Sequence, residues 1–155
     1  MLTENQFIEV AREAVEQLRR LSKDFPALST PQVKQALETW NEEMFRKGEI
    51  IWLEKERQRQ EKSALESRAQ ALVDSLLVDD ALDSLNQEFS KELDYQDLIN
   101  LAGRDKYIAA MRREAIELKQ NFVSPEQTAE LWNSLGKPVV GGERWVAGAV
   151  SVLMG

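Results

Sequence analysis

The stretch from Glu49 to Val78, EIIWLEKERQRQEKSALESRAQALVDSLLV, decides the fold of this chain. An apolar block, Ile50 to Leu53, stands at its start, and apolar side chains recur at helical spacing near its end. Between the two lies Glu54 to Lys62, nine residues without an apolar side chain. Such residues form helices readily but cannot line a core. The stretch therefore predicts one long helix with a polar centre that crosses solvent or meets a polar partner.

Two helices are predicted before this stretch. Thr3 and Gln6 form a capping-box pattern, which predicts a first helix over about residues 4–22. Its apolar face is formed by Phe7, Ala11, Ala14, Leu18 and Leu21. Thr30 and Pro31 predict the start of a second helix. Its apolar face is formed by Val33, Leu37, Trp40 and Met44. The second helix either ends at Gly48 or runs on into the long one.

Several short helices are predicted after the long one. Acidic N-cap residues start three of them, at Asp79 or Asp80, at Asp94 and at Asp105. The strongest start signal is SPEQ at residues 124–127, which combines an N-cap serine, a proline at the first helical position and a glutamine at the third. The sequence therefore predicts an all-α fold, a single helical bundle of five to seven helices.

The predicted bundle domain covers residues 1–136, and residues 137–155 form a tail of different character. Pro138 and the Gly141-Gly142 pair make a turn-rich break, and no charged residue follows Arg144. The apolar segment from Trp145 onward is compatible with a short helix or a strand. Because it would be a liability if exposed, we expect it to pack on the bundle, on a partner or on a second copy.

Composition excludes many chemistries. The chain has no histidine and no cysteine, which rules out Ser-His-Asp and Cys-His triads, thiolate-ligated metals and the histidine-containing zinc and di-iron motifs. We therefore predict no catalytic, cofactor-binding or metal-ligating residue and no cofactor. No secretory signal and no run of about 18 apolar residues is present, so we expect a cytoplasmic protein without a membrane partner.

The net charge of -7 comes from one region. Residues 63–100 hold nine acids and two bases, while the rest of the chain is balanced. This is either a solvated acidic face or a surface for a basic partner. Overall acidity argues against a free-standing nucleic-acid binder, because attraction to the phosphate backbone dominates such binding. A subunit that contacts nucleic acid only within a larger assembly remains compatible with it.

Two apolar blocks lie outside the predicted bundle faces and are candidate interfaces. Both contain a tryptophan, a residue type that anchors protein–protein contacts. The predicted interface residues are Ile51, Trp52, Trp145, Val146 and Val150.

The segment LSTPQVK at residues 28–34, followed by Leu37, resembles the start of a helix in small helical subunits of CRISPR effector complexes. That resemblance implies a non-catalytic subunit of an antiviral ribonucleoprotein, which contacts the RNA backbone through basic side chains. Lys34, Arg112 and Arg113 are the residues that this reading assigns to such contacts. The acidity of the chain departs from the family's expectation.

Three functions follow, in order of preference. The first is a non-enzymatic helical interaction subunit or adaptor of a multi-protein assembly, bound to other subunits or to a second copy of itself. The second is the small subunit of a CRISPR-type ribonucleoprotein. The third, from a different class, is a carboxylate-dependent metal binder or enzyme.

Overall fold

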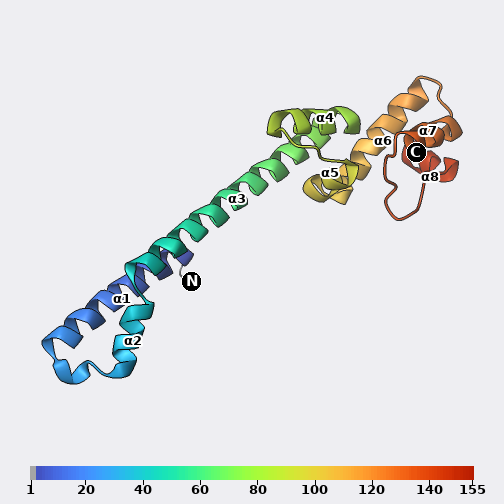
Figure 1. Ribbon diagram of the computed structural model, residues 1–155. Helices are drawn as coiled ribbons and strands as arrows, with labels where there is room; N and C mark the ends of the chain where they lie inside the picture. Colours follow the sequence, from blue (N-terminus) through green and yellow to red (C-terminus); the bar gives the residue numbers. More distant parts are fainter. Residues whose placement is uncertain (1–2) are drawn as a thin grey trace. The chain divides into compact units, whose positions relative to one another are not determined.

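The computed structural model describes residues 3–155, whose regular structure is entirely helical, with no strand (Figure 1). The elements are α1 (Glu4–Asp24), the 3₁₀ turn η1 (Pro26–Leu28), α2 (Pro31–Thr39), α3 (Glu42–Ser75), α4 (Val78–Phe89), α5 (Tyr95–Ala102), α6 (Arg104–Gln120), α7 (Pro125–Ser134) and α8 (Ala147–Met154). The predicted all-α class is confirmed. The predicted number of helices is too low, because these residues form eight α-helices.

The predicted long polar-centred helix forms as α3, but it runs from Glu42 to Ser75 and not over residues 49–78. Its polar centre is stabilised by ion pairs one turn apart, as in Arg59 to Glu56 at 3.0 Å and Lys62 to Glu66 at 3.8 Å. Residues 57–64 are all exposed. This part of α3 therefore rests on helix propensity and neighbouring side-chain pairs, and contributes nothing to a core.

The helix is interrupted between α2 and α3, where the apolar periodicity alone predicts one continuous helix. Asn41 supplies the start of α3, since its Oδ1 accepts a hydrogen bond from the Met44 backbone N–H at 3.0 Å. Gly48 does not end a helix but lies inside α3. A Cβ atom at Gly48 would lie 3.5 Å from Cδ1 of Ile8, so α1 passes close to α3 at this point.

The chain forms two compact units, Met1–Gln60 and Glu61–Gly155, which we call unit 1 and unit 2. The sequence predicts one bundle over residues 1–136, whereas the boundary between the units falls inside α3. Helical periodicity continues across that boundary, which is why the sequence pattern does not reveal it. Unit 2 has a hydrophobic core to which each helix from α3 to α8 contributes.

The C-terminal segment belongs to unit 2. Residues 147–154 form helix α8, which resolves the choice between helix and strand. Trp145, Val150 and Met154 are buried in the core of unit 2. Asn133 holds the segment in place, because its side chain accepts from the Trp145 N–H and donates to the Trp145 carbonyl, each at 2.9 Å. The tail therefore packs on helices of its own chain.

The end of α6 carries a strained residue. Phe122 has a φ of 60° and is 97% exposed, and the next N–H, that of Val123, closes the helix on the Leu118 carbonyl at 3.0 Å. A side chain in the left-handed region costs about 1–2 kcal/mol, and glycine avoids that cost. We expect Phe122→Gly to raise the free energy of unfolding by about 1 kcal/mol. The matched control Ala109→Gly, exposed within α6, should lower it by about 1 kcal/mol. Denaturant unfolding measures both, and a loss of stability in Phe122→Gly would contradict the expectation.

Candidate functional site

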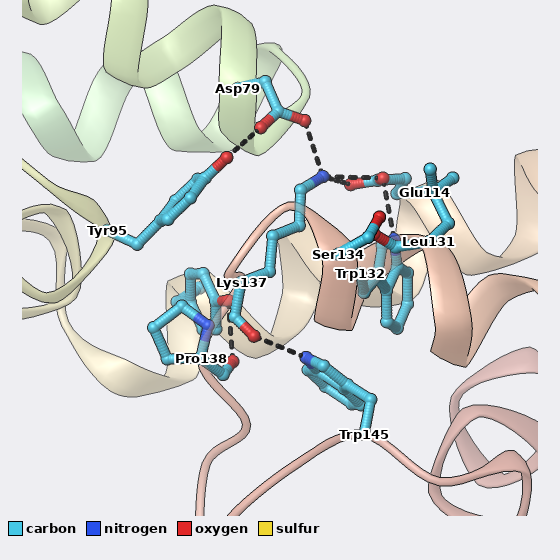
Figure 2. Close-up of polar contacts among 10 residues, drawn as sticks. Asp79, Tyr95, Glu114, Leu131, Trp132, Ser134, Lys137, Pro138 and Trp145 are labelled. Atoms are coloured by element: carbon cyan, nitrogen blue, oxygen red, sulfur yellow. Dashed lines mark hydrogen bonds and ion pairs between the residues drawn. The ribbon is translucent and has the colours of Figure 1, made fainter.

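A buried polar cluster lies in unit 2 and is centred on Lys137 (Figure 2). The Lys137 side chain is completely buried. Its Nζ lies 2.8 and 2.9 Å from the two carboxylate oxygens of Glu114, and 2.6 Å from Oδ2 of Asp79. One ammonium group therefore faces a carboxylate from α6 and another from α4, an arrangement in which all three charged groups are paired.

Aromatic side chains complete the cluster. Trp132 Nε1 donates to Glu114 at 2.9 Å, and Trp145 Nε1 donates to the Lys137 carbonyl at 3.0 Å. The two indole rings meet edge to face with centroids 4.7 Å apart. The Tyr95 hydroxyl donates to Asp79 (Figure 2). The cluster therefore ties α4, α5, α6 and α7 to the segment that precedes α8.

The contacts of the cluster shift the pKa values of Asp79 and Tyr95. Burial raises the pKa of Asp79, but the hydrogen bonds from Lys137 and Tyr95 outweigh it, so the pKa lies below its ordinary value. Burial raises the pKa of Tyr95 well above its ordinary value, and the hydrogen bond to Asp79 raises it further. Burial also raises the pKa of Tyr107, whose hydroxyl donates to the Pro138 carbonyl at 2.8 Å.

This cluster is built to hold unit 2 together. Because the Lys137 side chain has no exposed area, no molecule in solvent reaches its amine without unfolding the cluster. Glu114 is nearly as buried and already accepts from both Lys137 and Trp132. We therefore assign the cluster a structural role, as a polar clamp within the core.

The raised tyrosine pKa values predict a specific loss of stability in alkali. Tyr95 and Tyr107 are the only tyrosines in the chain, and their pKa values in the folded state exceed the unfolded value of about 10. The stability they contribute is therefore fully present below pH of about 10 and is lost as the pH rises through the folded pKa. We expect tyrosinate absorbance to rise only together with loss of the circular dichroism signal. Ionisation near pH 10 in a protein that stays helical would contradict this.

Unit 1 contrasts with unit 2, because within residues 3–60 only Phe45 is buried. A groove of about 290 Å³ with an almost wholly apolar lining runs between α1 and α2. Its walls are formed by Phe7, Ala11, Ala14, Val15 and Leu18 of α1, by Ala36 and Leu37 of α2, and by Trp40, which directly follows α2. We call this feature the α1–α2 groove.

Large apolar side chains of unit 1, including Phe7 and Trp40 of the groove, lie open to solvent. Those more than a third exposed are Phe7, Val10, Leu21, Phe25, Leu28, Trp40, Met44, Ile50, Ile51 and Leu53. Scattered apolar residues are normal on a protein surface, but a contiguous apolar groove beside them is characteristic of an interaction site. The α1–α2 groove is therefore the best candidate functional site of the described chain.

Polar contacts fix α1, which forms one wall of the groove, to the start of α3. Arg12 lies 2.8 Å from Glu49 and 3.4 Å from Glu42, and its guanidinium lies over the Phe45 ring at 5.4 Å. Glu4 pairs with Lys55 at 4.0 Å. These contacts use the side of α1 that carries Arg12 and leave its α2-facing side open.

The predicted interface residues divide between the two units. Ile51 is exposed in unit 1, and Trp52 is half-buried there beside α1. Val146 is half exposed in unit 2. Trp145 and Val150 are buried in the core of unit 2, which corrects their assignment to an interface. Their apolar surface is covered by α6, α7 and their own segment, so no partner is needed to explain it.

The predicted nucleic-acid contacts are divided between the two units. Lys34 lies in unit 1, whereas Arg112 and Arg113 lie on α6 of unit 2. Arg113 donates to the carbonyls of Val73 and Leu76 at 2.5 and 3.3 Å, and so satisfies free carbonyls at the end of α3. Contact between these residues and phosphate remains a prediction.

Sequence reasoning missed Lys137 and Glu114. Glu114 was detectable, since it follows Tyr107 and Met111 at helical spacing on the apolar face of α6. An acid in that position is either unpaired or matched by a buried base. Nothing in the sequence around Lys137 indicates that it is the matching base, because the pairing depends on how α6, α7 and the following loop pack.

No group of three or more acidic residues within residues 3–155 is placed to hold a metal ion. No helix in that range is both long and apolar enough to cross a membrane. No protein-family model, curated protein or solved structure matches the chain.

Proposed function

We propose that this chain is a non-enzymatic helical interaction subunit and that the α1–α2 groove of unit 1 is its docking surface. The observation that carries the proposal is the contrast in burial between the two units. Among residues 3–60 only Phe45 is buried, whereas unit 2 buries side chains from every one of its helices. Unit 2 therefore has a complete hydrophobic core, whereas unit 1 presents an exposed apolar surface.

Burial of that apolar surface against a partner is energetically favourable. Burial of apolar area contributes about 25 cal/mol per Å², and the groove presents aromatic side chains, Phe7 and Trp40, at 57% and 39% exposure. Aromatic residues in an apolar pocket are the side chains that contribute most to protein association. The short helix α2 also gains little from propensity alone, so a partner that fills the groove stabilises unit 1 as well as binding it.

Affinity purification with matched variants tests the proposal. Ala14 is exposed and lines the groove, so Ala14→Arg places a charge in the docking surface without filling a core. Gln60→Arg adds the same charge to an exposed position on α3. The tagged full chain and both variants are expressed in the native cell, purified with and without nuclease treatment, and compared by quantitative mass spectrometry.

We expect the wild type and Gln60→Arg to retain the same partner chains, and Ala14→Arg to retain at least about tenfold less, because a buried unpaired charge costs more than 1.4 kcal/mol. Circular dichroism confirms that each variant keeps its helices. Equal retention by all three proteins contradicts the proposal, as does the absence of any retained chain. Retention that nuclease abolishes favours the ribonucleoprotein alternative instead.

A further inference from the structure

Unit 2 contains a cavity of about 470 Å³ that the polar clamp does not fill. The cavity is formed by one side of α5, by the start of α6 and by residues 138–141 of the loop between α7 and α8. Its volume lies within the range of small-molecule sites, about 300–1,000 Å³. All of its lining belongs to unit 2, so the cavity is a feature separate from the α1–α2 groove of unit 1.

The charge of the cavity lining is positive. Arg104 is the only charged residue of the lining, which contains no acid. Its side chain is exposed and makes no ion pair or hydrogen bond with residues 3–155, whereas Arg68 and Lys106 of the same unit are paired with acids. A guanidinium group presents its N–H groups in a planar fork that matches the oxygens of a carboxylate or phosphate. The cavity is therefore suited to an anion.

Neutral amide groups lie in the same lining. Gln96 and Asn100 are exposed one turn apart on α5, and Gln96 Nε2 donates to Asn100 Oδ1 at 3.4 Å. This bond uses the oxygen of Asn100 and leaves its NH₂ group as a donor. Arg104 and Asn100 therefore both offer donors to a ligand, which favours a ligand whose polar group is an oxyanion.

The other side chains of the lining are apolar, and their position is fixed. They are Ile99, Pro138, Val139 and Val140. The Pro138 carbonyl accepts from the Tyr107 hydroxyl at 2.8 Å, and the preceding residue, Lys137, is held in the polar clamp (Figure 2). Because the loop is anchored at this point, the cavity is formed before a ligand enters, which lowers the entropic cost of binding.

We propose that this cavity binds a small organic anion. Its carboxylate or phosphate group contacts Arg104 and Asn100, and a short aliphatic portion packs on Val139 and Val140. The site goes beyond the docking function proposed for unit 1 and does not depend on it, so failure of either proposal leaves the other standing.

Titration of the purified full chain, followed by the backbone amide signals in nuclear magnetic resonance spectra, tests the proposal. The probes are acetate, isovalerate and inorganic phosphate, each as the sodium salt at constant ionic strength. We expect saturable shifts of the Gly103 and Gly141 signals, which both line the cavity. Isovalerate should bind at least about threefold more tightly than acetate, because its methyl groups are buried on the apolar side chains. The ratio of the phosphate and acetate dissociation constants identifies the preferred oxyanion.

Matched variants test the residues. Arg104→Gln should raise the dissociation constant at least about tenfold, since it removes a charged donor. Asn100→Asp, which is nearly isosteric, should weaken binding at least as much, because it places a negative charge beside the anion. Arg144→Gln serves as the control, since Arg144 is exposed in the same loop but does not line the cavity. Circular dichroism confirms that each variant keeps its helices.

Three results would overturn the proposal. The first is a set of shifts that do not saturate with any of the probes. The second is an equal dissociation constant for Arg104→Gln and Arg144→Gln, which would place the anion elsewhere. The third is isovalerate that binds no more tightly than acetate, which would remove the aliphatic portion of the ligand.

Discussion

Replacing Lys137 by methionine is expected to lower the free energy of unfolding by about 3–5 kcal/mol, the range measured when one member of a buried ion pair is removed. Methionine matches the length of the lysine stem, so packing changes little. The charge is what is lost. Glu114, nearly fully buried, would keep its negative charge beside Asp79 without the ammonium that separates the two carboxylates. The protein must then bury an unpaired charge.

Two controls isolate this effect. Lys106 pairs with Asp74 at 2.5 Å on the surface of unit 2, where both side chains are more than a third exposed, so Lys106→Met should cost at most about 1 kcal/mol. Combining Lys137→Met with Glu114→Gln removes the unpaired charge and keeps an acceptor for Trp132, and should recover part of the loss. Chemical denaturation followed by circular dichroism measures all three. If Lys137→Met lowers the free energy of unfolding no more than Lys106→Met does, the cluster does not stabilise unit 2.

The second large effect is expected for Trp132→Ala. Trp132 is fully buried, donates to Glu114 and packs edge to face against Trp145. Truncation of a buried tryptophan costs about 3–5 kcal/mol, through lost burial and the cavity left behind. The loss of its N–H also removes a donor from the buried carboxylate. We expect a large fall in the unfolding midpoint of unit 2.

Trp40→Ala is the matched comparison in unit 1. Trp40 is 39% exposed and lines the α1–α2 groove, so its truncation opens no closed cavity. We expect the stability of the isolated chain to change by less than about 1 kcal/mol, while binding to the partner weakens by more than about tenfold, as for an aromatic anchor. A tryptophan in unit 1 whose removal destabilises the protein as much as Trp132→Ala would contradict the distinction between core and docking surface.

Local signals in the sequence predict most of the helices. The capping boxes at Thr3 and Ser124 form as expected, each with hydrogen bonds of 3.2 and 3.0 Å. Thr30 also caps α2 as predicted. These features depend on residues within one turn of each other, so sequence alone specifies them. The break at Asn41 was missed because apolar periodicity continues from α2 into α3 and masks the cap.

Long-range packing was beyond the reach of the sequence. An apolar segment such as residues 145–154 gives the same pattern whether it covers its own chain or a partner, and only the structure shows that Trp145 and Val150 complete the core of unit 2. The division of the chain inside α3 is hidden for a related reason. Residues 57–64 continue a regular helix while contributing no buried side chain to either unit.

Site-specific photo-crosslinking tests most directly whether a protein surface covers the α1–α2 groove. The photoreactive analogue p-benzoylphenylalanine replaces Phe7, which lines the groove and is more than half exposed, so the added ring has room. The same analogue at Gln60, exposed on α3, serves as the control. After irradiation of the native cells, we predict a covalent adduct with another protein chain from position 7 and none from position 60. No protein adduct at position 7, or an equal adduct at position 60, would contradict the proposed docking surface.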